Sequence, residues 1–213
     1  MKPLLQAILL VSLAMAGATA AGQAREGKDY VVVSGQAGSA RADGKQGVEV
    51  LEFFSYACPH CARLEPMLEK WRRQLPPNVV LRRVPVTFGR EEWKVLARLY
   101  YTLESLGQVD SLHAKVFGAI HDEHKMLFTP EAQADWMARQ GRDRRAFLDA
   151  YNGFSVQARL AGANTLAQTY EIESVPSFVV AGRYRTDLDL TQGYEPLLKV
   201  ADELVRKSMR ATP

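Results

Sequence analysis

A nearly continuous apolar run, Val-Glu-Val-Leu-Glu-Phe-Phe, spans residues 48–54. It is too short for a helix and rich in β-branched and aromatic residues, so it predicts a buried β-strand. The segment that follows Cys58, from Ala62 to Leu75, has helical composition, and a pair of prolines ends it. A second apolar run over 79–86 predicts the next strand. The order strand, helix, strand predicts a right-handed crossover between two parallel strands.

After the second strand the hydrophobic period changes to that of helices. Apolar positions recur at helical spacing from Trp93 to Leu103 and again from Leu112 to Ile120. Thr129, which precedes a proline, and Asp143 are expected to cap two further helices. The region 91–152 is therefore predicted to be an all-helical insertion between the two halves of an α/β fold.

The second half of this fold is expected to contain a helix, two strands and a closing helix. The first helix is predicted over about 156–170, and an apolar β run follows over 174–180. The proline in that run indicates either an edge strand or a special turn, because proline cannot donate to the strand ladder. Residues 182–185 are the predicted hairpin partner, and 195–208 form the closing helix.

The N-terminal residues have the pattern of an export signal. Lys2 precedes an apolar stretch from Leu4 to Ala18, and Ala18-Thr19-Ala20 supplies the small-x-small pattern that signal peptidase accepts. We predict a secretory signal over residues 1–20 that is cleaved after Ala20. The alternative is an uncleaved membrane anchor, but the run is short for the roughly 20 residues that a span needs.

Charge excludes some classes of function. The formal net charge is +3 at pH 7, which is too near neutral for a protein whose main partner is nucleic acid or a polyanionic surface. Arginine clusters occur at 72–73, 82–83 and 142–145. We interpret them as solvated faces of surface elements.

Cys58 and Cys61 are the only two cysteines in the sequence. Their Cys-x-x-Cys spacing at the start of a helix within a β-α-β pattern is typical of a redox-active pair. Half of a zinc site is one alternative, but a structural zinc needs four ligands, and His121 and His124 lie far along the chain. A structural disulfide is the other alternative, but so short a loop constrains the unfolded chain very little. We therefore expect redox chemistry with no metal and no cofactor.

The expected export sets the direction of that chemistry. Thiols become oxidised outside the cytosol, so the pair is expected to donate its disulfide to other proteins. The positive end of a helix dipole favours a thiolate, and the better exposed Cys58 is predicted to be the sulfur that a substrate attacks. His60 is predicted to stabilise the Cys58 thiolate; its alternative is an ordinary exposed histidine. Pro59 suits the first turn of a helix in either case.

Glu52 is an acid inside the predicted buried strand. It shares a face with Val48, Val50 and Phe54, so strand alternation would bury it. A buried carboxylate without a partner usually responds with a raised pKa. We predict that Glu52 exchanges a proton with Cys61 as the mixed disulfide resolves. The alternative is an acid at a strand edge that reaches solvent or pairs with an arginine.

Residues 50–61, Val-Leu-Glu-Phe-Phe-Ser-Tyr-Ala-Cys-Pro-His-Cys, closely resemble the active-site segment of the DsbA family, the periplasmic thiol oxidases of the thioredoxin superfamily. Similar counterparts cover essentially the whole mature chain, among them the segments 102–107, 117–121 and 175–184. The resemblance implies a thioredoxin-like fold with a helical insertion. It also implies that Val175 and Pro176 form a cis-proline loop that offers backbone groups to an extended substrate, and that a DsbB-like inner-membrane partner reoxidises the protein by passing electrons to quinone.

The sequence thus predicts a monomeric periplasmic oxidase of reduced, unfolded or newly exported proteins. Residues 21–90 and 153–213 are expected to form the thioredoxin-like domain, and 91–152 the inserted helical domain. A disulfide isomerase or reductase of the same fold is one rival, but such proteins usually carry a dimerisation domain ahead of the catalytic one, and the segment between Ala20 and Val48 is too short for it. The rival from another class is a metal- or peptide-binding module with incidental cysteines.

Overall fold

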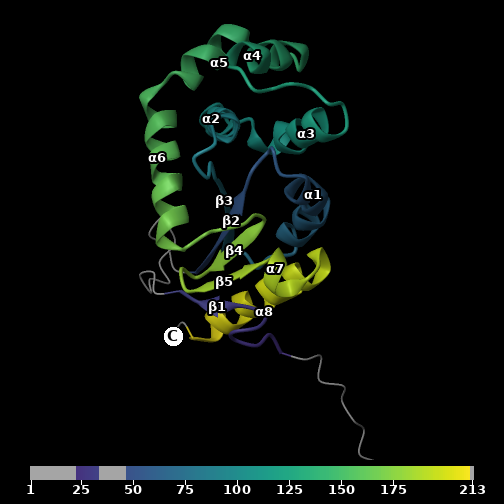
Figure 1. The fold of residues 1–213 in the computed structure, drawn as a ribbon, viewed down its shortest axis with the longest axis vertical. Coiled ribbons are helices and arrows are strands. Elements are labelled where there is room, and N and C mark those ends of the chain that lie inside the picture. Colours follow the sequence, from purple (N-terminus) through teal and green to yellow (C-terminus); the bar gives the residue numbers. More distant parts are fainter. Residues whose placement is uncertain (1–22, 34–46, 212–213) are drawn as a thin grey trace, which may run out of the picture.

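The computed structural model describes residues 23–33 and 47–211. Their strands form one sheet in the order β1-β5-β4-β2-β3 (Figure 1). The strands are β1 (Val31–Val32), β2 (Val48–Phe54), β3 (Val79–Pro85), β4 (Ser177–Val180) and β5 (Tyr184–Asp187). β2 and β3 run parallel, and the other neighbouring pairs are antiparallel. The parallel pair and the helix between its strands confirm the predicted strand, helix, strand unit.

Helices surround this sheet and extend beyond one end of it. They are α1 (Pro59–Arg72), α2 (Glu91–Ser105), α3 (Val109–His121), α4 (Pro130–Arg139), α5 (Arg144–Tyr151), α6 (Phe154–Thr169), α7 (Leu188–Thr191) and α8 (Tyr194–Ala211). In Figure 1, α2 to α5 gather above the sheet, α6 returns along one side of it, and α8 lies beneath it. The helices of 91–152 thus come consecutively between β3 and α6, as the sequence predicts.

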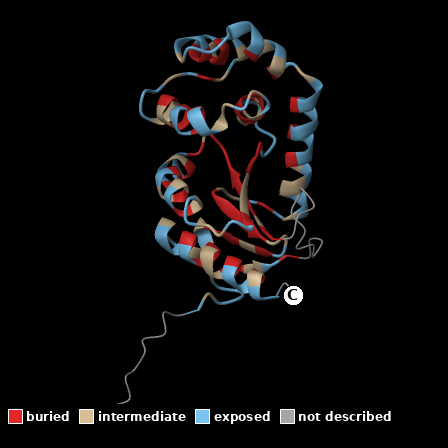
Figure 2. Cartoon of the chain, turned by 180° about the vertical axis from the view of Figure 1, so that it is seen from behind, coloured by how far each residue is buried: buried red, intermediate tan, exposed pale blue. Residues whose placement is uncertain are grey.

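Both faces of β2 are covered, which explains why its sequence is an almost continuous apolar run. Val48 and Val50 belong to a core that β2 shares with α1 and α8. Leu51 and Phe53 belong to a second core, which the sheet shares with the helices α2 to α6. Figure 2 shows the buried central strands in red. The helical region therefore packs on one face of the sheet, and the predicted domain limits at 90 and 153 stay predictions.

Two predicted helix caps are confirmed. The Thr129 hydroxyl accepts a hydrogen bond of 3.2 Å from the Ala132 N–H at the start of α4. The Asp143 carboxylate accepts one of 2.8 Å from the Ala146 N–H at the start of α5. Each such cap satisfies a backbone donor that the helix leaves unpaired, and it stabilises the helix by about 1 kcal/mol.

One alternative for the proline-containing strand is wrong. β4 lies between β5 and β2, so it is not an edge strand. The other alternative, a special turn, is confirmed because the Val175–Pro176 peptide bond is cis. Pro176 precedes Ser177, the first residue of β4, so the sheet does not need an N–H from the proline.

The interpretation of Arg82 and Arg83 as a solvated face is also wrong. Arg83 is 8% exposed, and Arg82 is half-buried with its guanidinium on Glu49, 2.9 Å from Nε to Oε1. Arg83 lies opposite Glu52 in the parallel register of β2 and β3. The sequence pattern did not reveal this burial because a charged pair inside a sheet has no periodic signature.

The predicted signal sequence, residues 1–20 with cleavage after Ala20, lies outside the described residues. The segment 34–46 lies outside them as well. Within 23–33 and 47–211, no helix is long and apolar enough to cross a membrane.

Candidate active site

The two cysteines lie where β2 passes into α1, as the sequence predicts. Cys58 is the N-cap residue of α1, Pro59 occupies the first helical turn, and Cys61 follows one turn later. The Cys58 N–H donates a 3.0 Å hydrogen bond to the carbonyl of Ser55, which closes a tight turn after the strand. Both cysteines are free thiols, and their exposed fractions are 6% for Cys58 and 2% for Cys61. Cys58 is therefore the more accessible sulfur.

The environment of Cys58 stabilises its thiolate. Its pKa is lowered to about 6, chiefly by a hydrogen bond from the Cys61 side chain. Burial opposes this effect, while the backbone N–H groups of Cys61 and His60 and the charge of Arg63 support it. These backbone groups are unpaired donors of the first helical turn, where an anion is favoured. At neutral pH Cys58 is mainly the reactive thiolate.

Cys61 has the opposite environment. Burial raises its pKa well above the usual value for cysteine, and the Cys58 thiolate, which accepts a hydrogen bond from Cys61, and the charge of Glu52 act in the same direction. Cys61 therefore holds its proton strongly. The pair combines one anionic sulfur at the surface with one protonated sulfur beneath it.

The loop that contains the cis peptide bond lies against Cys58. In its thiol form, Cys58 donates a hydrogen bond of 3.5 Å to the carbonyl of Val175. Pro176 is buried, and Val175 is partly exposed beside the sulfur. The structure thus brings together Val175, Pro176 and Cys58, which are far apart in the sequence.

His60 is exposed and its imidazole contacts the start of α8 rather than Cys58. Its Nδ1 lies 2.8 Å from the hydroxyl of Tyr194 in a hydrogen bond. The contribution of His60 to the lowered pKa of Cys58 comes through its backbone N–H. Stabilisation of the thiolate by the imidazole stays a prediction. Sequence reasoning did not find the Tyr194 contact, because it depends on how α8 packs beside α1.

Glu52 is 2% exposed and has a cationic partner, so it combines features of both interpretations of the sequence. Its Oε2 lies 3.2 Å from Nε of Arg83. Burial raises the pKa of Glu52 to about 8; Arg83 lowers it, and the charges of Glu65 and Glu69 raise it. At pH 7 the Glu52 carboxyl is therefore mainly protonated, in spite of its ion-pair partner.

Sequence reasoning missed three residues around Glu52. Glu65 is 4% exposed, on α1, and its Oε1 lies 3.2 Å from Nη2 of Arg83. His113 is 3% exposed, on α3, and its Nε2 lies 3.4 Å from Oε2 of Glu65. We call Glu52, Glu65, Arg83 and His113 the buried charge cluster. One signal was present in the sequence: Glu65 follows Cys61 by four positions and therefore shares its face of the helix.

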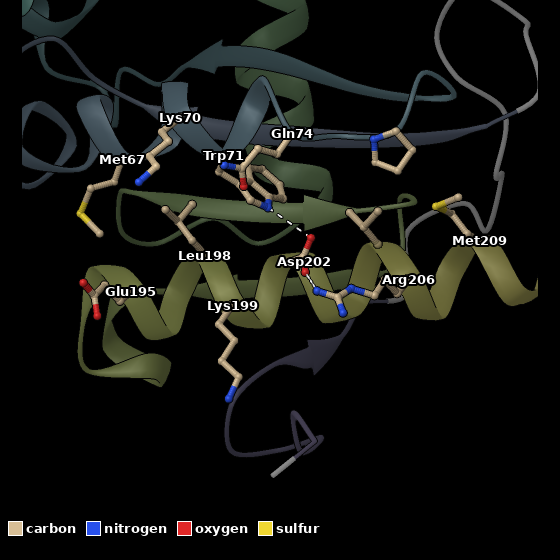
Figure 3. Close-up of a pocket in the computed structure, with 12 residues that line it drawn as sticks. Met67, Lys70, Trp71, Gln74, Glu195, Leu198, Lys199, Asp202, Arg206 and Met209 are labelled. Atoms are coloured by element: carbon tan, nitrogen blue, oxygen red, sulfur yellow. Dashed lines mark hydrogen bonds and ion pairs between the residues drawn. The ribbon is translucent and has the colours of Figure 1, made fainter. Parts of the chain in front are cut away.

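A groove separates α1 from α8, and Figure 3 shows its lining. Its volume is about 820 Å³, and Met67, Trp71 and Leu198 contribute apolar surface to it. The indole of Trp71 donates a hydrogen bond of 3.3 Å to the carboxylate of Asp202, which also pairs with Arg206 (Figure 3). The cysteines do not line this groove, so the redox chemistry takes place outside it.

No three His, Cys, Asp or Glu side chains in the described parts of the chain are placed to hold a metal ion together. His121, one of the two histidines considered as zinc ligands, lies at the end of α3, and its Nε2 is 2.8 Å from the carbonyl oxygen of Tyr56. His124 is exposed in the loop that follows.

Comparison with known proteins places the chain in a family. The model of the family described as "DSBA-like thioredoxin domain" matches residues 49–204. The thiol:disulfide interchange protein DsbA of Bordetella parapertussis is 43% identical over 206 residues, which cover 95% of this chain and 96% of that protein. DsbA of Pseudomonas aeruginosa PAO1 is 41% identical over 208 residues, or 96% of this chain and 97% of that protein.

Solved structures give the same result. The crystal structure of Pseudomonas aeruginosa DsbA superposes with a TM-score of 0.80 at 40% identity, covering 87% of this chain and 94% of that one. DsbA from Xylella fastidiosa superposes with a TM-score of 0.79 at 31% identity, covering 88% and 98%. The thioredoxin-like fold with its helical insertion is thereby confirmed, and the chain belongs to the DsbA family of thiol:disulfide oxidoreductases.

Proposed function

We propose that the protein oxidises pairs of thiols in other proteins by donating a disulfide between Cys58 and Cys61. The single observation that carries this proposal is the asymmetry of the two sulfurs. The pKa of Cys58 is lowered to about 6, and the pKa of Cys61 is raised. A dithiol whose accessible thiolate is stabilised in the reduced state is a strong oxidant, because stabilising the reduced form raises the reduction potential.

The reaction proceeds by two thiol–disulfide exchanges. A substrate thiolate attacks Sγ of Cys58, the bond between the two cysteines breaks, and Cys61 leaves with the electron pair and takes up a proton. A second substrate thiolate then attacks the substrate sulfur of the mixed disulfide, and Cys58 leaves as the thiolate. Two electrons pass from the substrate to the cysteine pair, and the substrate gains a disulfide. The lowered pKa of Cys58 suits its role as leaving group in the second exchange, whereas the raised pKa of Cys61 means that its departure in the first exchange needs a proton donor.

Glu52 is the proton carrier for Cys61. Its carboxyl is mainly protonated at neutral pH because burial raises its pKa to about 8. The charge of Glu52 raises the pKa of Cys61, and this electrostatic coupling supports the proposed transfer. When Cys61 leaves as a thiolate, Glu52 gives it a proton, and the carboxylate that results is stabilised by Arg83.

The other predicted site residues act around Cys58. Pro59 begins α1 and directs the first-turn N–H groups of His60 and Cys61 toward the sulfur. The Val175 carbonyl lies 3.5 Å from Cys58 Sγ. An extended substrate segment therefore passes along Val175 and Pro176, with its backbone bonded to Val175, as its cysteine approaches Cys58.

The partners follow from this reaction. The clients are reduced, unfolded or newly exported proteins. A DsbB-like inner-membrane protein takes the electrons from the reduced pair and passes them to quinone. The mature protein begins after Ala20 and works as a monomer in the periplasm, where thiols are exposed to oxidation. Its thioredoxin-like domain comprises 21–90 and 153–213, with the helical domain 91–152 inserted.

The test is the reduction potential of the purified mature chain, measured against glutathione, with its metal content determined alongside. We expect a metal-free protein that is more oxidising than thioredoxin and that oxidises a reduced, unfolded substrate. Cys58→Ser abolishes this activity. A potential at or below that of thioredoxin, stoichiometric zinc, or an active Cys58→Ser variant contradicts the proposal. Rearrangement of a scrambled substrate, faster than oxidation of a reduced one, favours the isomerase.

A further inference from the structure

His113 is a buried titratable group that the reaction described above does not use. It lies on α3 at 3% exposure, among the rings of Phe54, Tyr100 and Phe117, whose centroids are 5.2 to 5.9 Å from its own. An apolar side chain would fill such a place at no electrostatic cost. The imidazole is therefore kept for its two nitrogen atoms, each of which has a polar partner.

The two nitrogens of His113 face groups of different chemistry. Nδ1 lies 2.7 Å from the hydroxyl of Tyr56 in a hydrogen bond. Nε2 lies 3.4 Å from Oε2 of Glu65, and within the described residues it has no hydrogen bond of good geometry. A nitrogen that faces a carboxylate carries the proton. A hydroxyl can donate to Nδ1 of a neutral ring or accept from a charged one, so both protonation states of His113 have partners.

The acidic groups of the buried charge cluster outnumber its permanent cations. Glu52 and Glu65 are two acids, and the guanidinium of Arg83 lies between them, with contacts of 3.2 Å to each. Glu69, at the edge, is shared between Arg83 and Arg72. With both acids ionised, Glu52, Glu65 and Arg83 together carry one uncompensated negative charge. Such a charge away from water is costly, so the cluster retains one proton.

Two groups of the cluster can hold that proton: the carboxyl of Glu52 and the imidazole of His113. Burial lowers the pKa of His113, so its ring is neutral while Glu52 is protonated. Glu52 has no direct contact with His113; once it becomes a carboxylate it takes a larger share of the charge of Arg83, so Glu65 is less compensated and favours the imidazolium, 3.4 Å away. The two groups therefore titrate as a coupled pair across the Glu65–Arg83 bridge.

We propose that His113 provides the counter-charge for Glu52: when Glu52 gives its proton to Cys61, His113 binds a proton from solvent and restores the charge of the cluster. This inference rests on the proposed role of Glu52. The proton moves from the Glu52 carboxyl to Sγ of Cys61, and a second proton from solvent enters past Glu65 and leaves His113 protonated at both ring nitrogens. The Tyr56 hydroxyl then turns from donor to acceptor. His113 is a positioning residue, because it acts on Cys61 through Glu52.

The side of His113 that faces Glu65 lies nearest to solvent. Glu65 lines a cleft of about 400 Å³ between α1 and α3, so a proton can enter the cluster through the Glu65 carboxylate, next to Nε2 of His113. The titratable and charged groups that face His113 come from every element packed against it. They are Tyr56 of the turn after β2, Glu65 and Glu69 of α1, Arg83 of β3 and Tyr100 of α2; Glu52 of β2 lies behind Arg83, which it contacts. The raised pKa values of Tyr56 and Tyr100 keep both phenols neutral.

The experiment follows the protonated Glu52 carboxyl in the oxidised mature chain by the infrared C=O stretch, as a function of pH. The Glu52→Gln variant assigns the band. In His113→Gln, which keeps a side chain able to hydrogen-bond but cannot titrate, Glu52 holds its proton more firmly. We expect the pH at which half of the Glu52 carboxyl is ionised, its midpoint, to rise by about one unit in this variant. Two sites titrate as a coupled pair when they interact by about this amount. We also expect opening of the disulfide by a substrate thiol at pH 7 to slow several-fold.

His124→Gln is the matched control, since it makes the same change at an exposed histidine outside the cluster. It leaves the midpoint unchanged. Tyr56→Phe removes the acceptor of the imidazolium and moves the midpoint in the same direction as His113→Gln, by less. A purely structural role for His113 lowers the unfolding temperature without moving the midpoint, and that result overturns the inference.

The proposed function of Glu52 can fail separately. Oxidation by Glu52→Gln at the wild-type rate shows that Glu52 carries no proton for Cys61. The infrared midpoint in His113→Gln still decides whether the two groups are coupled.

Discussion

Cys58 and Cys61 occupy one turn of the same helix, yet the surface side of that turn and its buried side have opposite electrostatics. Around Cys58, backbone N–H groups of the helix start and the Cys61 thiol lower the pKa to about 6. Around Cys61, burial and neighbouring negative groups raise the pKa. A helix terminus offers its unpaired donors over a single turn only. A spacing of three residues is therefore enough to give two identical side chains different chemistry.

The two sides also differ in how they are built. The surface side consists mainly of local features, namely a helix start and a proline, and only the Val175 carbonyl comes from a distant part of the chain. The buried side draws charged groups from β2, β3, α1 and α3 into one cluster. The substrate meets the local part, and the proton is handled by the assembled part. Substitutions on the two sides should thus affect different measurements.

The largest expected effect is on thiol reactivity. In Cys61→Ser a hydroxyl remains to donate to Cys58, and the Cys58 thiolate predominates at pH 7. In Cys58→Ser the remaining thiol at Cys61 is buried and protonated. We expect iodoacetamide to alkylate the first variant on the order of 100-fold faster than the second at pH 7. Equal alkylation rates in the two variants would show that the environments of Cys58 and Cys61 do not differ in the way described.

Cys61→Ala sharpens the same comparison. Alanine cannot donate a hydrogen bond, and the Cys61 side chain is the main cause of the lowered pKa of Cys58. We expect the pKa of Cys58, followed by the ultraviolet absorbance of its thiolate, to be higher in Cys61→Ala than in Cys61→Ser. The same pKa in both variants would assign the effect to the helix start alone.

Arg83→Met tests the assembly of the buried side. It leaves Glu52 and Glu65 in the core without their cation, and breaking a buried pair in this way costs about 3–5 kcal/mol of unfolding free energy. Urea unfolding at pH 7 measures the loss. At pH 5 the loss should be smaller because Glu52, whose pKa burial raises, is then fully protonated and needs no cation. Arg83→Lys keeps the charge and should lose less. A loss below 1 kcal/mol in Arg83→Met, about that of an exposed ion pair, would show that the cluster is not buried in solution.

Glu52→Gln should change how stability depends on pH. The pKa of Glu52 is about 8 in the folded protein against an ordinary value of 4.5. A raised pKa contributes stability that is complete below the unfolded value and is lost as pH rises to the folded value. Between these limits the wild type should lose up to about 1.4 kcal/mol per pH unit relative to Glu52→Gln. Urea unfolding of the wild type and of Glu52→Gln between pH 4.5 and about 8 measures this difference. If the unfolding free energies of the two proteins changed in parallel with pH, the raised pKa of Glu52 would be contradicted.

The smallest expected effect belongs to the exposed histidine. The backbone N–H of His60 survives its substitution, and the imidazole is bonded to Tyr194. Interactions at an exposed helix end contribute about 0.3–1 kcal/mol, so loss of the imidazole in His60→Ser should raise the pKa of Cys58 by about half a unit. Tyr194→Phe should change it less. An unchanged pKa in His60→Ser would limit the role of His60 to its backbone.

Sequence patterns predicted several elements of the fold correctly. The run 48–54 predicted β2 with its observed limits, and Thr129 and Asp143 predicted the starts of α4 and α5. Hydrophobic periodicity and helix caps are properties of neighbouring residues, so the sequence displays them directly. The strand containing Pro176 was left between two alternatives, because a proline gives the same local signal at an edge and beside a cis bond.

Some residues of the candidate site were also predictable from local sequence, and others were not. Cys58, Pro59 and Cys61 were identifiable from spacing alone, and strand alternation predicted the burial of Glu52. The identity of its partner was not predictable, since Arg82 and Arg83 look alike in the sequence. The side chain of Arg83 points toward α1 only because β3 pairs with β2 in the observed register.

The sequence by itself determined the redox pair, its place at a helix start, and the resemblance to a family of oxidants. Only the tertiary structure decided why Cys61 keeps its proton, where the cis peptide lies relative to Cys58, and how Arg83, Glu65 and His113 meet Glu52. The physical reason is the range of the interactions. Periodicity and capping act within a few residues along the chain, whereas desolvation and charge coupling act between groups that the fold brings together.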